Sequence, residues 1–358
     1  MKTLLDIHQI MKRSNILHNG LAVLALALTA SACSMMSEDR SDCPDCRNPL
    51  RVTLKYDYNI QRADMFNDHV GAAVCYVVDE SDKIVAKQYA ANSAEARPLA
   101  QRTFGFNFEG LAAGNYRIFA VGAQKDFGTL TNFTPTDLDE GSSIRDLRLA
   151  IDHAATDQPL DTLWHGAVGN IQLQERQPAE AEVSLMRDTK NLSIMLVQNT
   201  NPTDNYAENY DVSITDNNGL LDYDNSQLAD PELTYTPYAS WTSETVEEES
   251  SRAPGDVIQR TAHFDLSFGR LFEHADASKN ARLVIRNHQT GDKIVDIDLV
   301  YYLALVRNAA ENRYGVQEFL DRAYDYRLDF ILEGNEWRFL TLSINVIGWS
   351  LRIQNASI

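Results

Sequence analysis

Much of the chain alternates between apolar and polar residues with a period of two. In the first such run, residues 50–58, every even position from Leu50 to Tyr58 is apolar or aromatic. Because successive side chains of a strand point to opposite faces, this period is typical of strands with one buried face. Further short strands are predicted at residues 73–79, 83–87, 104–108 and 116–121. Short strands separated by turn residues predict an antiparallel β-sandwich.

The same pattern resumes after residue 187 and predicts a second sandwich. Strands are expected at residues 192–197, 210–215, 263–268, 283–286 and 294–299, with a closing hairpin at 324–332 and 340–346. Leu299, Leu303 and Val306 share one helical face, and residues 316–322 predict another short helix. The glutamate-rich residues 242–255 are predicted to form a surface loop. The predicted fold is therefore all-β, with antiparallel sandwiches at 49–187 and 188–358 and a minor helical insertion in the second.

The N-terminal segment has the pattern of an export signal. A basic pair, Lys12 and Arg13, precedes the apolar residues 21–30, a stretch shorter than the roughly 20 residues that a membrane-spanning helix needs. Ala30-Ser31-Ala32-Cys33 resembles a bacterial lipobox, which implies a signal peptide at residues 1–32 and acylation of Cys33. Ordinary secretory cleavage that leaves Cys33 as a free thiol stays an alternative, and the start at Met1 or Met11 stays open.

Three further cysteines follow. Cys43 and Cys46 have a spacing found in redox proteins, but they lie in a polar stretch, residues 33–48, that we interpret as a flexible tether. A redox dithiol needs a setting that lowers a thiol pKa. We therefore expect a small structural disulfide between them. Cys75 lies in an apolar strand pattern and is expected to be a buried, inert thiol.

Composition and charge argue against several classes of function. The 358 residues are 44% hydrophobic and 23% charged, which is ordinary for a globular protein, and the net charge of −19 would repel nucleic acid and anionic lipid headgroups. The sequence contains no glycine-rich phosphate loop, no His-Glu-x-x-His and no Gly-x-Ser-x-Gly. We therefore expect neither an enzyme nor a protein that needs a metal or other cofactor.

Several segments, taken in order, resemble the FimB/Mfa family of fimbrial lipoproteins, which supplies anchor and accessory subunits of type V pili. The segments are Asp42-Cys43-Pro44, Tyr56-Asp57-Tyr58-Asn59, Trp164-His165-Gly166, Leu185-Met186-Arg187-Asp188-Thr189, Asn218 to Asn225, Tyr235-Thr236-Pro237-Tyr238, Phe319-Leu320-Asp321-Arg322 and Ile344 to Trp349. The resemblance implies two tandem transthyretin-like sandwiches and strand exchange between subunits. It also implies fimbrial stalk subunits as partners and a surface-exposed, lipid-anchored place in the outer membrane.

Two features of the chain keep alternatives open. Trp349, Leu351 and Ile353 alternate with polar residues at the C-terminus, so this segment is either a strand donated to a neighbouring subunit or the last strand of this chain. The alternative to an anchor is a tip or accessory adhesin, or a glycan-binding surface lipoprotein. For that role Tyr235, Tyr238 and Trp241 are expected to be exposed aromatic side chains that could stack on sugars, although packing at turns and sheet edges explains them as well. A fibre built on the protein could carry adhesion to a host or bacterial surface.

One short motif suggests a modification. Asp161-Thr162-Leu163 fits the Asp-Ser/Thr-apolar pattern of bacterial O-glycosylation sites. A single match in a chain of this length can also arise by chance.

Overall fold

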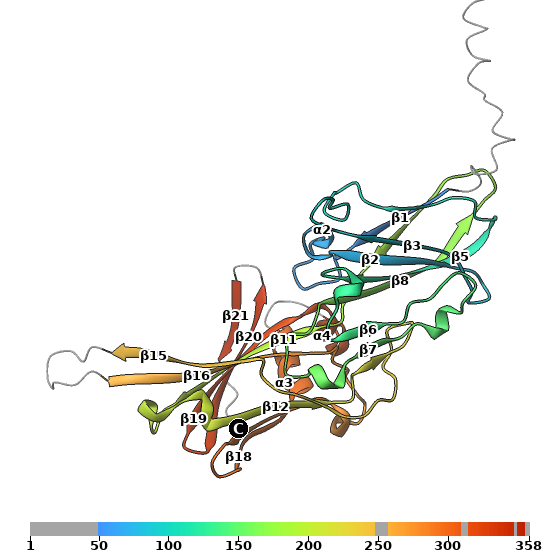
Figure 1. Cartoon of the computed structure of the whole chain (residues 1–358). Coiled ribbons are helices and arrows are strands. Elements are labelled where there is room, and N and C mark those ends of the chain that lie inside the picture. Colours follow the sequence, from blue (N-terminus) through green and yellow to red (C-terminus); the bar gives the residue numbers. More distant parts are fainter. Residues whose placement is uncertain (1–48, 248–256, 309–313, 347–348, 355–358) are drawn as a thin grey trace, which may run out of the picture. The chain divides into compact units, whose positions relative to one another are not determined.

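The computed structural model describes residues 49–247, 257–308, 314–346 and 349–354 (Figure 1). These residues belong to one compact unit. The predicted signal peptide and tether, and the predictions for Cys33, Cys43 and Cys46, lie outside the described residues. The described chain is built mainly from antiparallel sheets, which confirms the all-β prediction.

Two sheets pack together in the first half of the chain. One has the order β4-β1-β9 and is formed by β1 (Leu50–Lys55), β4 (Phe106–Phe108) and β9 (Ala179–Ser184). The other has the order β10-β8-β5-β2-β3 and contains β2 (Ala72–Val78), β3 (Ile84–Ala91), β5 (Gly114–Ala123), β8 (Leu163–Leu173) and β10 (Met186–Arg187). β1 pairs antiparallel with β4 but parallel with β9. The alternate burial of β1 follows the period that the sequence predicts.

Strand β2 is buried along its whole length, unlike β1. Val74 and Tyr76 face a core that continues into the second half of the chain. Cys75 and Val77 face the core of the first two sheets. Because both faces of β2 are covered, its sequence is a continuous apolar run and the thiol of Cys75 has no exposure.

The second half contains a six-stranded sheet packed on a four-stranded one. The first has the order β15-β16-β11-β19-β20-β21 and contains β11 (Lys190–Gln198), β15 (Ala239–Glu247), β16 (Val257–Phe268), β19 (Asp325–Glu333), β20 (Glu336–Val346) and β21 (Trp349–Gln354). The second has the order β14-β12-β17-β18 and contains β12 (Tyr210–Asp216), β14 (Leu233–Tyr235), β17 (Arg282–Asn287) and β18 (Lys293–Asp298). Ile194, Phe264 and Leu328, from three neighbouring strands of the larger sheet, are buried in one core with Ile214 and Ile285 of the smaller sheet.

A small three-stranded sheet joins the two halves. β7 (Leu149–Ile151) is its central strand and pairs antiparallel with β6 (Phe133–Pro135) on one side and with β13 (Leu220–Leu221) on the other. The hydrophobic core that includes Val121 also includes Leu221 and Phe268. The boundary between residues 187 and 188 stays a prediction, since strands from both sides of it contribute to this sheet.

Helices are short, and the two longest lie in the second half, as the sequence predicts. They are α3 (Leu299–Ala304), followed directly by the 3₁₀ turn η8 (Leu305–Asn308), and α4 (Val316–Arg322). Asp298 caps α3, where its carboxylate accepts a hydrogen bond from the Tyr301 backbone N–H at 2.9 Å. The remaining helical elements are α2 (Phe66–His69), η2 (Phe127–Thr129), η3 (Ile144–Asp146), η4 (His153–Ala155), η5 (Pro202–Asp204), η6 (Ala207–Asn209) and η7 (Ala277–Lys279). Within the described ranges, no helix has the length and apolar character needed to span a bilayer.

The predicted surface loop at residues 242–255 is wrong in its first part. Residues 242–247 continue strand β15, which pairs with β16 as far as Glu247 and Val257 (Figure 1). The glutamates suggested a loop, but β15 is an edge strand, and edge strands often carry charged residues, which discourage pairing with another chain. The rest of the predicted loop lies outside the described residues.

Candidate functional site

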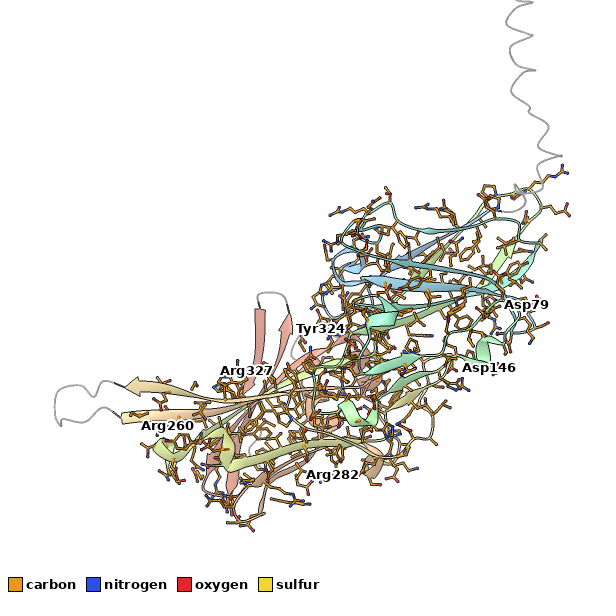
Figure 2. All side chains as sticks on the ribbon, viewed as in Figure 1. Asp79, Asp146, Arg260, Arg282, Tyr324 and Arg327 are labelled. Atoms are coloured by element: carbon orange, nitrogen blue, oxygen red, sulfur yellow. The ribbon has the colours of Figure 1, made fainter. Side chains whose placement is uncertain are left out.

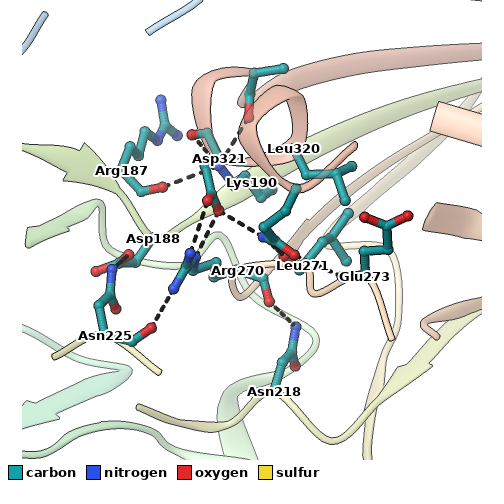
Figure 3. Close-up of polar contacts among 12 residues, drawn as sticks. Arg187, Asp188, Lys190, Asn218, Asn225, Arg270, Leu271, Glu273, Leu320 and Asp321 are labelled. Atoms are coloured by element: carbon teal, nitrogen blue, oxygen red, sulfur yellow. Dashed lines mark hydrogen bonds and ion pairs between the residues drawn. The ribbon is translucent and has the colours of Figure 1, made fainter. Parts of the chain in front are cut away.

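Lys190, the first residue of β11, is fully buried at the point where the two halves meet. Its ammonium group donates hydrogen bonds to the backbone oxygens of Arg187, Asp321 and Ala323, at 3.1, 3.0 and 2.9 Å (Figure 3). A lysine side chain has three donors, so all of them are used. These bonds tie the start of β11 to the end of α4 and the chain that follows it.

A buried ion pair lies beside Lys190. Arg270 donates from Nε and Nη2 to the two carboxylate oxygens of Asp321, at 2.8 and 2.9 Å (Figure 3). Gln317, one turn earlier on α4, donates to the same carboxylate at 2.9 Å. Two parallel bonds from a guanidinium fix its plane as well as its position. Arg270 is thereby held in one orientation relative to α4.

Asn225 and Asp188 extend this network toward the first half of the chain. The third nitrogen of Arg270, Nη1, donates to the backbone oxygen of Asn225. The Asn225 amide in turn donates to the Asp188 carboxylate at 2.8 Å (Figure 3). We call the set Arg187, Asp188, Lys190, Asn225, Arg270, Gln317 and Asp321 the polar junction. It connects four segments that are far apart in the sequence.

Burial dominates the electrostatics of the polar junction. Desolvation lowers the pKa of Lys190 to about 7, although Asp321 and Asp188 oppose this shift. It raises the pKa of Asp188 to about 6, against the effect of Arg270. It also lowers the pKa of the nearby His165 to about 4. Because the pKa values of these groups differ from their ordinary values, the free energy of unfolding depends on pH.

Aromatic side chains form a second layer around the polar junction. The Tyr56 ring meets Trp164 edge to face at 5.5 Å and lies 6.4 Å from Tyr324. The guanidinium carbon of Arg187 lies 4.5 Å from the centre of the Tyr324 ring, a cation–π contact. Figure 2 labels Tyr324 at this position between the two halves. The layer joins residues of β8, β10 and the chain before β19.

The Trp164-His165-Gly166 segment of β8 requires a glycine at its third position. A β-carbon on Gly166 would lie 2.6 Å from the backbone oxygen of Ser184, closer than real side chains approach. His165 pairs its ring Nε2 with the backbone oxygen of Tyr223 at 2.9 Å. The segment therefore brings β8 into close contact with two other parts of the chain.

The prediction that Tyr235 is exposed is wrong. Its side chain is completely buried, and its hydroxyl donates to the Asn218 side-chain oxygen at 2.6 Å. Asn218 donates in turn to the backbone oxygen of Arg270 at 3.0 Å (Figure 3). Tyr238 and Trp241 are exposed as predicted, at 37% and 45%. The indole of Trp241 stacks on His263 with ring centres 4.9 Å apart and planes 3° from parallel.

The modification motif at Thr162 is not accessible. Thr162 and Asp161 are both buried, and Asp161 is bound by Lys125 and by the backbone N–H of Thr131. The motif therefore serves the structure here, and O-glycosylation at Thr162 of the folded protein is contradicted.

The C-terminal segment that the sequence left open forms a strand in the described structure. Trp349–Gln354 is β21, at the edge of the six-stranded sheet, and pairs antiparallel with β20 (Figure 1). Its register sets Ile353 opposite Leu342 and Leu351 opposite Ile344. An edge strand has one side of its backbone unpaired within its sheet, so this arrangement is compatible with pairing to another chain.

The structure brings most of the segments behind the family resemblance to one place. The segments containing Tyr56, Trp164, Asp188, Asn225 and Asp321 all meet at the polar junction or its aromatic layer. Sequence reasoning missed the central Lys190 and Arg270, because a lone lysine or arginine in a strand pattern normally indicates a solvent-facing position. Among the described residues, no group of three His, Cys, Asp or Glu side chains could hold a metal ion.

The packed sheets place the protein in the class of all-β sandwich proteins. Comparison with known proteins shows to which family of that class it belongs. The chain belongs to the family of fimbrillin-A associated anchor proteins Mfa1 and Mfa2, whose family model matches residues 40–355. This membership associates the chain with fimbriae. A search of curated proteins gives no match.

Solved structures agree with the family assignment. A provisionally named adhesin from Bacteroides thetaiotaomicron VPI-5482 is 25% identical, with a TM-score of 0.72, over 86% of this chain and 99% of that one. A provisionally named polysaccharide-binding protein from the same organism is 28% identical, with a TM-score of 0.65, over 86% and 98%. The fimbrial anchor protein Mfa2 from Porphyromonas gingivalis is 14% identical, with a TM-score of 0.56, over 86% and 99%, and shows the shared fold.

Proposed function

We propose that the protein is an outer-membrane lipoprotein that anchors or caps a fimbria at the cell surface. Acylation of Cys33 would hold one end of the chain in the membrane, and pairing of β-strands would join the folded body to a fimbrial stalk subunit. The match of the anchor-protein family to residues 40–355 is the observation that carries the proposal.

The arrangement of β1 supports a role at the end of a fibre. β1 lies in the middle of its sheet and pairs with β4 on one side and β9 on the other. Removing it would break two ladders and expose Val52 and Leu54, which are buried. We infer that β1 stays in place, so the end of the protein that follows the tether does not open to accept a strand.

The opposite end of the chain offers a pairing edge. β21 is the last strand of the six-stranded sheet, and only β20 pairs with it among the described strands. An extended segment of a stalk subunit could satisfy its remaining backbone groups, or β21 itself could leave β20 and pair with that subunit. In both cases residues 349–354 carry the junction with the fibre.

Deleting residues 349–358 in the native strain tests this proposal. We expect the truncated protein to stay in the outer membrane while fibres are released into the medium, as measured by immunoblot of both fractions. A Cys33→Ala variant should instead release the protein itself from the membrane. Trp241→Ala, at the opposite edge of the same sheet, is the matched control and should retain its fibres. Normal-length fibres retained by the truncated protein would contradict the role of this strand.

A second candidate, an adhesin or glycan-binding lipoprotein, is favoured by one observation. Trp241 is exposed and stacks on His263, and an exposed aromatic ring suits the apolar face of a sugar. Purification from outer membranes separates the two functions. Co-purifying fimbrial subunits would support the anchor, and bound polysaccharide without subunits would support the adhesin.

A further inference from the structure

A cavity of about 620 Å³ lies against β3 in the first half of the chain. Val74 and Tyr76 of β2 and Lys87 and Tyr89 of β3 line it, so it covers one face of the five-stranded sheet at its edge. Residues of η2 and β6, with the turns beside them, complete the lining. None of the lining residues belongs to the polar junction or to β21. The volume is within the range of small-ligand sites.

Four aromatic side chains line this cavity: Tyr76 of β2, Tyr89 of β3, Phe127 of η2 and Phe133 of β6. The ring centres of Tyr89 and Phe127 lie 5.6 Å apart, with their planes tilted by 43°. Tyr76 and Phe133 are buried, whereas Tyr89 is 45% exposed. The cavity therefore has an apolar base and meets solvent beside Tyr89. An apolar or aromatic side chain that enters it would be removed from water.

Lys87 does not make this cavity positive, because two carboxylates lie beside its ammonium group. The ammonium forms an ion pair with Asp137, and the Asp139 carboxylate lies 3.8 Å from the same nitrogen. Both aspartate side chains are largely exposed, at 86% and 93%. The two carboxylates exceed the charge of the one ammonium.

Asp126 adds a negative charge that forms no ion pair within the described ranges. Its carboxylate accepts hydrogen bonds from the Tyr89 hydroxyl and from a backbone N–H of its own turn, each at 2.8 Å. Both of these donors are neutral. The neighbouring Lys125 is paired with Asp161. Three carboxylates thus lie around one ammonium, so a cationic group on a ligand is favoured at this cavity.

β3 is also the edge strand of its sheet, with β2 as its neighbour. The chain itself uses the outer edge at the first residue of β3. The Ile84 N–H donates to the Ser142 oxygen at 3.0 Å, and the Ile84 oxygen accepts from the Gly141 N–H at 2.8 Å. Beyond Ile84, no other strand of the described chain pairs with this edge.

The register of β2 and β3 shows which backbone groups are open at this edge. The Asn92 N–H donates to the Gly71 oxygen, and the pairing of the two strands continues from there. Hydrogen-bonded pairs alternate with non-bonded pairs in an antiparallel ladder, so residues 86, 88 and 90 bond to β2 and residues 87, 89 and 91 face outward. The side chains of Lys87 and Tyr89 line the cavity. A strand added to this edge would therefore place every second side chain on the cavity's face of the sheet.

We propose that this edge and cavity bind an extended basic peptide segment of another protein. Its backbone pairs with residues 87–91 of β3, an apolar or aromatic side chain enters the cavity, and a lysine or arginine two residues away lies beside Asp126. An acidic segment would be repelled by the three carboxylates, and a small organic cation would leave the backbone groups unpaired. No strand of this chain has to leave its sheet and β21 takes no part, so the inference does not rest on the proposed function.

Calorimetric titration of the purified full-length mature protein with synthetic peptides tests the proposal. The first probe has nine residues with blocked ends, alternating threonine and valine, with a central phenylalanine and a lysine two residues after it. The second has glutamate in place of that lysine, and the third is N-methylated at alternate residues and cannot pair as a strand. We expect the lysine peptide to bind and each of the others to bind at least about tenfold more weakly. The difference between lysine and glutamate should shrink at high salt.

Asp126→Asn should reduce the preference for lysine over glutamate at least about threefold. Asp276→Asn is the matched control, because Asp276 also caps a 3₁₀ turn, η7, and does not line the cavity. It should leave binding unchanged, and thermal melting should show that both variants fold. Tyr89→Ala should weaken both the lysine and the glutamate peptide, since it removes one aromatic side of the cavity.

Three results would overturn the proposal: no binding of the lysine peptide, equal binding of the lysine and glutamate peptides, or an equal effect of Asp126→Asn and Asp276→Asn. Equal binding of the N-methylated peptide, or equal competition by lysine amide, would show a small-cation site and contradict strand pairing. The protein that lacks residues 349–358 should bind the lysine peptide as the full chain does. Fibre retention is measured separately, so this proposal and the proposed function can each fail alone.

Discussion

The guanidinium of Arg270 and the carboxylate of Asp321 face each other across the polar junction, joined by two hydrogen bonds of 2.8 and 2.9 Å. Both side chains are largely buried, with 12% and 7% exposure. One lies just after β16 and the other in α4, so the pair fixes the helical insertion against the six-stranded sheet.

Replacing Asp321 with asparagine should strongly destabilise the protein. Arg270 would keep its charge in a buried site without the carboxylate that it hydrogen-bonds, and breaking a buried pair in this way costs about 3–5 kcal/mol. Urea unfolding monitored by tryptophan fluorescence gives the free energy of unfolding. Glu333→Gln breaks the exposed pair with Arg338 and should cost less than about 1 kcal/mol. Equal losses in the two variants would show that the buried pair has no special role.

His165 should make the stability of the protein depend on pH. Burial lowers its pKa from 6.5 to about 4, so between these values the unfolded chain binds a proton that the folded chain does not. Its contribution therefore raises the free energy of unfolding as pH rises from 4 to 6.5, by up to about 3 kcal/mol. His165→Gln keeps a donor for the Tyr223 oxygen but does not titrate. The free energy of unfolding of the wild type, minus that of the variant, should therefore increase as pH rises from 4 to 6.5.

As pH rises, Asp188 should change the free energy of unfolding in the direction opposite to that of His165. Burial raises its pKa from 3.8 to about 6, so in that window the folded chain holds a proton that the unfolded chain has released. Stability from this group falls as pH rises through the window. Asp188→Asn should therefore be more stable, relative to wild type, at about pH 7 than at about pH 4. A difference that does not change with pH would show that the carboxyl keeps its ordinary pKa.

Gly166→Ala should lower the free energy of unfolding, because β8 and the end of β9 are in close contact at this glycine. The added methyl would lie 2.6 Å from the Ser184 backbone oxygen, so one strand must shift, at a cost of about 1–3 kcal/mol. Gly169, three residues later in the same strand, is the matched control. A β-carbon there meets only the Arg117 side chain, at 3.8 Å. Chemical denaturation of both variants should show a loss for Gly166→Ala alone.

The Cys75 thiol should not react in the folded protein. It is fully buried, and desolvation raises its pKa, which disfavours the reactive thiolate. A variant in which Cys33, Cys43 and Cys46 are replaced by alanine isolates this thiol. Ellman's reagent should label it only after denaturant is added. Rapid labelling under native conditions would show that the strand opens readily.

Local patterns were sufficient for many individual elements. Alternation along residues 50–58 predicted β1, and the shared face of Leu299 and Leu303 predicted the helix that became α3. They failed for β8, because its second half contains the exposed residues Gly169 and Asn170 and does not alternate regularly between buried and exposed positions. They also failed for the end of β15, where glutamates at an edge strand looked like a loop.

The sequence by itself determined the all-β class and the family resemblance, because period-two burial and short motifs depend on residues close together in the chain. Only the tertiary structure decided that Lys190 and Arg270 are buried, that Tyr235 is not exposed, and that Tyr89 and Phe133 line one cavity. Those outcomes depend on contacts between segments that are distant in the sequence. For these side chains, burial is set by distant segments that pack over them, and the residues next to them in the sequence do not specify those segments.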